Sequence, residues 1–242
     1  MNIELLHPLR DLDQLPYFYP IDTRELYEKN LLIQAAEWSW RDRSIRYDLN
    51  TQGYRCEEWS SIDWNSSILC FGCSMTFGIG VDTDQTWPHY LSLVSGHPCV
   101  NLAQPGASVA FNWANSVKLL AQGIRPRAVI YYWPDYSRSF EFVEGLRTVN
   151  WGSWIKPQLS PGQLGHVGSA WAVNPVHARA MSLLYMQSLN WSCPRLDLTW
   201  SPDPLPGQQH HLVKLDHARD LRHPGPVSNQ QFAQDVCAQL KI

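Results

Sequence analysis

The chain has 242 residues, of which 44% are hydrophobic and 17% are charged, and its formal net charge is -3. This composition excludes a disordered chain, and the length indicates one main domain, with room for an appendage. The 19 basic residues are scattered along the sequence rather than gathered into a stripe, so we do not expect nucleic acid as a partner.

The sequence contains no pattern typical of a signal peptide or a membrane span. The first residues lack a basic start followed by a long apolar stretch, and no later apolar run reaches the roughly 20 residues that cross a bilayer. We therefore expect a cytoplasmic protein without a transmembrane segment. The six cysteines are too sparse for a disulfide scaffold, and most are expected to be small buried residues.

Residues 1–60 are predicted to form an N-terminal appendage. The expected parts, in chain order, are an irregular Pro- and aromatic-rich strap over 1–20, a helix from about residue 22 to Trp38, and a small ribbon over 44–55. Asp22 and Glu25 have the spacing of a capping box, which places the start of the helix there.

Residues 61–242 are predicted to form an α/β domain. Short apolar strands are expected at 68–71, 100–102, 128–133 and 196–200, and helices at about 86–95, 107–122, 176–190 and from Ser228, where Gln231 completes a capping box. Continuous apolar strands that alternate with helices are typical of a parallel sheet covered on both faces. The predicted fold is a three-layer α/β/α sandwich with a mainly parallel sheet.

Two stretches between these elements are candidates for a substrate pocket. One is an insertion at about 139–174, rich in Gly, Pro and Trp, and the other is the polar loop at 201–222. Ligands of open α/β sheets bind beyond the carboxyl ends of the strands, where such loops gather. The tryptophans of the insertion, Trp151, Trp154 and Trp171, make a glycan or aromatic ester a plausible substrate.

A candidate nucleophile follows the first strand of this domain. Ser74 lies between Gly72 and Gly78, where the chain turns away from the strand. A hydroxyl at such an edge projects from the sheet, and backbone N–H groups at a helix start can receive an oxyanion. A serine that only caps a helix is an equally good interpretation of this motif alone.

A candidate acid–base pair lies near the end of the polar loop. Asp220 precedes His223 by three residues, so its carboxylate can reach the imidazole within one turn. Asp220 would hold the imidazole in one tautomer, and His223 would take the proton of Ser74 and return it to the leaving alcohol. A solvated surface ion pair is the commoner interpretation of such a pair by itself.

Taken together, Ser74 after the first strand and Asp-x-x-His-Pro before the last helix resemble the SGNH, or GDSL, hydrolase superfamily over roughly residues 45–240. The family's Gly-Asp-Ser block appears as Gly72-Cys73-Ser74, and its second block, with a glycine, matches Asn101 to Gly106. The resemblance implies a flavodoxin-like SGNH fold, Ser74, Asp220 and His223 as catalytic residues, and an oxyanion hole formed by the N–H groups of Ser74 and Gly106.

At the third block, this chain departs from the family's pattern. The family places an oxyanion-binding asparagine after the next strand, where this chain reads Trp133-Pro134-Asp135. A missing donor typically costs about 10²- to 10³-fold in turnover. The protein could turn over its substrate slowly, could be inactive, or could use a substitute donor. The candidate donors are Asn112, Asn115 and Arg138. We expect Asp135 to pair with Arg138 or to bind substrate hydroxyls.

Two other chemistries compete with this interpretation. Cys70 and Cys73 have the spacing of a redox dithiol after a strand. A second possibility is a metal site in the histidine-rich stretch before the last helix, with candidate ligands His210, His211, His217, Asp220 and His223. Their spacing matches no recognised ligand motif, and we expect no metal at the site.

The sequence therefore predicts a serine esterase or deacylase that forms an acyl-serine intermediate on a small-molecule or glycan ester and needs no cofactor. Asp135, Arg138 and Asn112 are the candidate substrate-binding residues. The alternative is a protein of the same fold that has little or no turnover and binds a glycan or acyl ligand in the old pocket.

Overall fold

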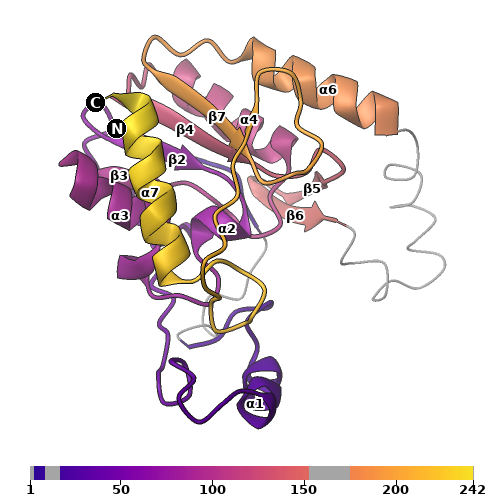
Figure 1. Ribbon diagram of the computed structural model, residues 1–242. Coiled ribbons are helices and arrows are strands. Elements are labelled where there is room, and N and C mark those ends of the chain that lie inside the picture. Colours follow the sequence, from indigo (N-terminus) through magenta and orange to yellow (C-terminus); the bar gives the residue numbers. More distant parts are fainter. Residues whose placement is uncertain (1–2, 9–16, 153–174, 242) are drawn as a thin grey trace.

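A computed structural model of the chain describes residues 3–8, 17–152 and 175–241 (Figure 1). Its main sheet has five strands in the order β3-β2-β4-β7-β8, and every neighbouring pair is parallel. The strands are β2 (Ile68–Phe71), β3 (Cys99–Asn101), β4 (Ala128–Trp133), β7 (Arg195–Thr199) and β8 (Gln209–His210). The four expected strands and the parallel sheet are confirmed, and the short edge strand β8 is an addition.

Side chains of the central strands alternate between two apolar layers. Ile68 and Cys70 of β2 point to one face, where α3 (Trp87–Ser95) and α7 (Pro226–Leu240) cover them. Leu69 and Phe71 point to the other face, toward α4 (Val109–Ala121) and α6 (Pro175–Ser188). Because helices cover both faces, the predicted three-layer α/β/α sandwich is confirmed.

A second, smaller sheet lies beside α4, in the order β1-β6-β5. Strands β5 (Ser139–Glu144) and β6 (Arg147–Trp151) form an antiparallel hairpin within the predicted insertion, and β1 (His7–Pro8) adds to β6 in parallel. The remainder of the insertion, with Trp154 and Trp171, lies outside the described residues.

The N-terminal segment differs from the prediction in three ways. Helix α1 (Arg24–Ile33) ends before Trp38, and Thr23, not Asp22, is its N-cap: the Thr23 hydroxyl accepts the N–H of Leu26. The expected ribbon over 44–55 contains no strand. Asp22 is unavailable for capping because its carboxylate is buried in an ion pair described below. Whether residues 1–60 form a separate appendage stays a prediction.

The start of the last helix also differs. α7 begins at Pro226 with Gly225 as its N-cap, so Ser228 lies within the first turn. Proline suits the first helical position because its backbone angle is already helical and no N–H is lost there. The Ser228 hydroxyl instead donates to the carboxylate of Asp216, 2.7 Å away, and the predicted capping box at Ser228 is wrong.

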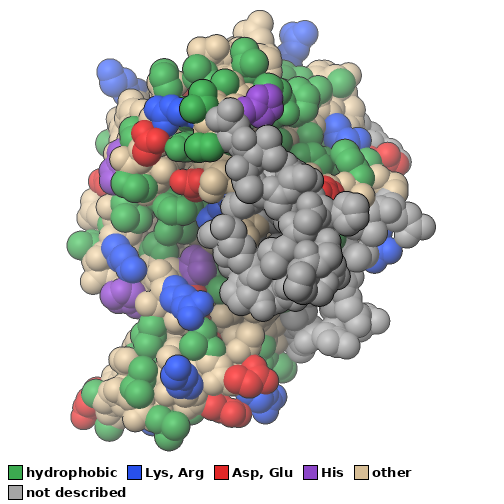
Figure 2. All heavy atoms as spheres, turned by 90° about the vertical axis from the view of Figure 1, so that its right-hand side faces the viewer, with side chains coloured by type: hydrophobic (Ala, Val, Ile, Leu, Met, Phe, Trp, Pro, Cys, Tyr) green, Lys and Arg blue, Asp and Glu red, His purple; other side chains and the backbone are tan. Residues whose placement is uncertain are grey.

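The described surface agrees with the scattered charge of the sequence. Figure 2 shows Lys and Arg side chains interspersed with Asp and Glu on the described part of one face, without a basic stripe. Within the described ranges, no helix combines the length and the apolar character needed to cross a bilayer.

Candidate active site

Ser74 begins α2 (Ser74–Phe77), a single helical turn that follows β2 directly. The turn needs glycine before it: a Cβ atom on Gly72 would lie 2.1 Å from the Oγ1 atom of Thr76. Gly78 ends the turn in a left-handed conformation, with φ of 84°. The two glycines therefore place Ser74 at the carboxyl end of the sheet, with its side chain nearly buried.

The loop before α7 brings its acid–base pair to this serine. The Nε2 atom of His223 lies 2.8 Å from the Oγ atom of Ser74, and its Nδ1 atom lies 2.5 Å from Oδ2 of Asp220. Leu221, between the pair, has a positive φ of 60°, which closes the turn tightly enough for the carboxylate to reach the imidazole. The structure thus joins Ser74, His223 and Asp220 in one hydrogen-bonded chain.

Asp220 lies in surroundings that keep its carboxylate ionised. Burial alone would raise its pKa, but the hydrogen bond and charge of His223, with the N–H groups of Arg222 and His223, lower the pKa below its ordinary value. Both N–H groups donate to Oδ1 over 3.0 Å. The Asp220 side chain is fully buried, so this carboxylate is held in place as well as charged.

The charged carboxylate determines the tautomer of His223. A carboxylate only accepts hydrogen bonds, so the proton between His223 and Asp220 belongs to Nδ1. In the neutral ring, Nε2 then has a free lone pair directed at the Ser74 hydroxyl. This arrangement can remove a proton from Ser74.

The two backbone amides of the predicted oxyanion hole lie at the starts of turns that follow β2 and β3. Gly106 adopts a left-handed conformation, with φ of 77°, in the turn after β3. The preceding Pro105 carbonyl accepts a hydrogen bond from the Nδ2 atom of Asn150, on β6. No described residue accepts a hydrogen bond from the N–H of Ser74 or of Gly106. Their role as an oxyanion hole stays a prediction.

The asparagines considered as substitute donors have other roles. Asn112 is fully buried in α4, and its Nδ2 atom donates to the carbonyl of Ser108. Asn115 is also buried, and its Nδ2 atom donates to Tyr54 and to Leu6. Both side-chain amides donate hydrogen bonds within the core. A substrate-binding role for Asn112 is therefore without support.

Asp135 and Arg138 lie on the loop after β4, both partly exposed. The carboxylate of Asp135 accepts from the N–H of Ser137 and the hydroxyl of Ser201. The Arg138 guanidinium lies over the ring of Trp200, 5.2 Å from its centroid. Trp200 also packs against the apolar cluster that contains Cys73, the neighbour of Ser74. Both residues stay candidates for substrate binding.

The geometry opposes the redox interpretation. Cys70 and Cys73 belong to different apolar clusters. Burial raises the pKa of the Cys70 thiol well above its ordinary value, whereas a reactive dithiol needs a lowered pKa.

Among the described residues, no group of three or more His, Cys, Asp or Glu side chains gathers in a way that could hold a metal ion.

Two residues beside this site, Asp22 and Arg219, were not predicted. They are separated by 197 positions and form a fully buried ion pair. Asp22 has the spacing of a helix cap in the sequence, and no sequence motif assigns a role to Arg219. Neither short-range spacing nor composition signals a pairing at this distance along the chain.

Comparison with known proteins found no matching family model and no matching curated protein. Solved structures do match. They include a lipolytic protein of the G-D-S-L family from Desulfitobacterium hafniense DCB-2, with 13% identity, a TM-score of 0.35, and coverage of 73% of this chain and 99% of that one. A G-D-S-L family member from Veillonella parvula DSM 2008 has 11% identity, a TM-score of 0.32, and coverage of 73% and 74%.

A third structure is a carbohydrate esterase of family 2 with a carbohydrate-binding domain, from Corynascus thermopiles (Myceliophthora fergusii). It has 11% identity, a TM-score of 0.34, and coverage of 73% of this chain and 67% of that one. The G-D-S-L group named in the first two structures is the group that the sequence motifs resemble.

Proposed function

We propose that the chain is a serine esterase or deacylase that hydrolyses a small-molecule or glycan ester through an acyl-serine intermediate. The observation that carries the proposal is the 2.8 Å contact between Ser74 Oγ and His223 Nε2, with His223 oriented by a buried, ionised Asp220. A nucleophile, a base and an orienting carboxylate in this order are what acyl transfer to a serine requires.

The proposed reaction has two halves. Ser74 Oγ attacks the ester carbonyl while His223 Nε2 takes its proton, and the N–H groups of Ser74 and Gly106 bind the oxyanion that forms. The tetrahedral intermediate collapses, and the leaving alcohol receives the proton from His223. Water, deprotonated by His223, then attacks the acyl-serine and releases the acid, and the proton returns to Ser74.

The missing third-block asparagine affects the expected rate. Two backbone donors remain for the oxyanion, and a third one typically contributes about 10²- to 10³-fold. We therefore expect turnover that is slow but depends on Ser74. A binding protein without turnover is the second candidate, and the residues Trp133-Pro134-Asp135 in place of that asparagine are what favours it.

The test combines labelling by a fluorophosphonate probe with turnover of a short-chain aryl ester, for the native chain and for Ser74→Ala. We expect both signals in the native chain and neither in the variant. Ser67→Ala is the matched control, because Ser67 is a buried serine at the amino end of β2 whose hydroxyl donates to the carbonyl of Asp63. Labelling and turnover that do not change in Ser74→Ala would disprove the proposal and favour the binding protein.

A further inference from the structure

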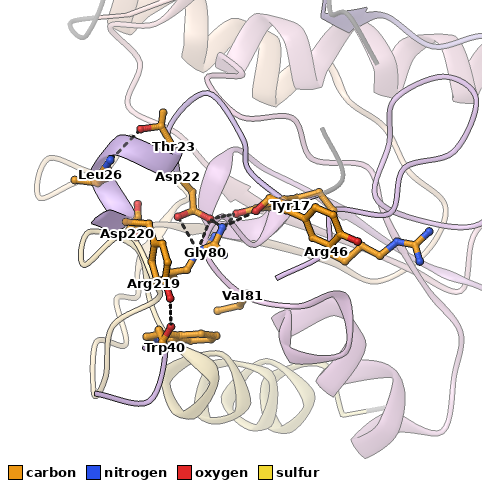
Figure 3. A network of polar contacts seen from close by, with 12 residues as sticks. Tyr17, Asp22, Thr23, Leu26, Trp40, Arg46, Gly80, Val81, Arg219 and Asp220 are labelled. Carbon is orange, nitrogen blue, oxygen red and sulfur yellow. Dashed lines mark hydrogen bonds and ion pairs between the residues drawn. The ribbon is translucent and has the colours of Figure 1, made fainter. Parts of the chain in front are cut away.

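A fully buried ion pair joins the N-terminal segment to the loop that carries Asp220 (Figure 3). The Nη2 atom of Arg219 lies 2.7 Å from Oδ2 of Asp22, and its Nε atom lies 3.1 Å from Oδ1. The exposed fraction of the two side chains is 2% and 1%. Charges removed from water this completely are tolerated only when paired and well hydrogen-bonded, so the pair fixes the geometry of both segments.

The same carboxylate reaches the loop that follows Ser74. The Tyr47 hydroxyl donates to Oδ2 of Asp22 over 2.6 Å and accepts the N–H of Gly80 over 2.8 Å. Gly80 in turn accepts the N–H of Arg219 through its carbonyl, over 2.9 Å. Asp22, Tyr47, Gly80 and Arg219 therefore form a closed ring of hydrogen bonds, which ties the loop after the nucleophile to the loop before Asp220.

Further side chains from the N-terminal segment hold the backbone on either side of Arg219. The Nδ2 atom of Asn30 donates to the Arg219 carbonyl, and the indole N–H of Trp40 donates to the His217 carbonyl. The Arg219 guanidinium lies over the rings of Phe18 and Tyr27, with its carbon atom 4.6 and 5.3 Å from their centroids. The residue immediately before Asp220 is thus fixed through its backbone and its side chain.

We propose that Asp22 is a positioning residue: through the ring with Tyr47, Gly80 and Arg219 it sets the distance between the Ser74 and His223–Asp220 halves of the site. Asp220 is peptide-bonded to Arg219, so a displacement of Arg219 moves the carboxylate that orients His223. Displacements of about 1 Å can lower a rate by about 10²-fold. The turnover test of this inference rests on the proposed function. A second test does not depend on turnover.

The first test measures turnover per fluorophosphonate-titrated serine, together with KM and the melting temperature. In Asp22→Asn the buried cation loses its charged partner, and we expect turnover per titrated serine to fall about 10- to 100-fold with KM little changed. The double variant Asp22→Leu, Arg219→Met removes both charges. It should regain the melting temperature, because apolar replacements of a buried pair are tolerated, but not the turnover. Recovery of both would mean a structural role only and would overturn the proposal.

A matched pair of tyrosine variants isolates the hydroxyl of the ring. Tyr47→Phe removes the contacts to Asp22 and Gly80. Tyr131→Phe removes an equally buried hydroxyl, bonded to Ser116 and Trp191 in the core. We expect a fall of about 10-fold in turnover per titrated serine for Tyr47→Phe only. Equal falls in both variants would overturn the proposal.

The second test does not require turnover. The proton between His223 Nδ1 and Asp220 should give a far-downfield proton resonance, identified by its loss in His223→Ala. We expect this resonance to be lost or displaced in Asp22→Asn and in the double variant, and retained in Tyr131→Phe. If the native chain lacks turnover but Asp22→Asn still moves the resonance, the proposed function fails and the positioning role stands. A resonance missing from the native chain, or unchanged in Asp22→Asn, overturns the positioning role.

Discussion

The Nε2 atom of His223 lies 2.8 Å from the Oγ atom of Ser74, although the two residues are 149 positions apart in the chain. The first belongs to the loop before α7 and the second to the turn after β2, so the contact depends on how these two loops meet. The carboxylate of Asp220 holds the imidazole, and Gly80, in the loop that follows Ser74, accepts the N–H of Arg219, next to Asp220.

Asp220→Asn should lower turnover by about 10³- to 10⁴-fold with little change in KM, because an amide no longer enforces the tautomer with a free Nε2. Turnover per titrated serine checks this expectation. The matched control is Asp216→Asn in the same loop, whose carboxylate accepts the N–H groups of Val227 and Ser228 at the start of α7. The control should lose about 0.5–2 kcal/mol of stability and keep its turnover. Equal turnover in the two variants would contradict the assignment of Asp220.

Asp220 should also make the free energy of unfolding depend on pH in the acid range. Its pKa in the folded chain is lowered from 3.8, so its contribution to stability is fully present above that value and is lost as the pH falls through the folded pKa. Urea unfolding between about pH 2 and pH 6 should show a steeper acid loss for the native chain than for Asp220→Asn. Parallel curves would mean that the folded pKa of Asp220 is not lowered.

Gly80→Ala and Gly123→Ala separate backbone strain from collision. Both glycines have nearly the same positive φ, 76° and 75°. A Cβ on Gly123 meets nothing within 4 Å, whereas one on Gly80 would lie 2.8 Å from the Cβ of Ala218. We expect a loss of about 1–2 kcal/mol for Gly123→Ala, from φ alone, and a larger loss for Gly80→Ala. Only Gly80→Ala should lower turnover per titrated serine, and an equal effect on turnover in both would contradict this.

Arg55→Met should destabilise the loop after α2. The buried Arg55 donates to the carbonyls of Gly78 and Val81 over 2.5 and 2.8 Å, and burial lowers its pKa to about 10, so it is still charged at neutral pH. Each carbonyl left without a donor costs about 1–3 kcal/mol. Arg46→Met, at an exposed arginine paired with Asp48, should change the unfolding free energy by less than about 1 kcal/mol. Similar midpoints for the two variants in urea unfolding would refute the prediction.

The main sheet could be predicted because its signal is local. Leu69, Phe71 and their neighbours in β2 are buried on both faces, and such strands appear in the sequence as uninterrupted apolar runs. Strand β1 was not predicted because His7 and Pro8 have no strand pattern and their partner strand, β6, lies 140 positions away. The β5–β6 hairpin lies in a stretch that was predicted only as an insertion rich in Gly, Pro and Trp, without assigned strands.

In the candidate site, too, residues in local motifs could be predicted, and residues paired by tertiary packing could not. Ser74, Asp220 and His223 could be named because each lies in a short motif of residue types with one shared chemistry. Asp22 was misassigned because an acidic residue before a helix is a common cap, and capping depends on neighbours only. Its actual partner, Arg219, is chosen by tertiary packing. A buried charge of this kind cannot be recognised until the chain is folded around it.

The Asp22–Arg219 pair has a consequence for the newly made protein. A ribosome that has synthesised only the first 200 residues has released the nucleophile but neither the imidazole nor the partner of Asp22. Asp22 therefore lacks its cationic partner until residue 219 has emerged. Any chemistry at Ser74 that uses the His223 imidazole therefore requires the chain to have been made at least as far as residue 223.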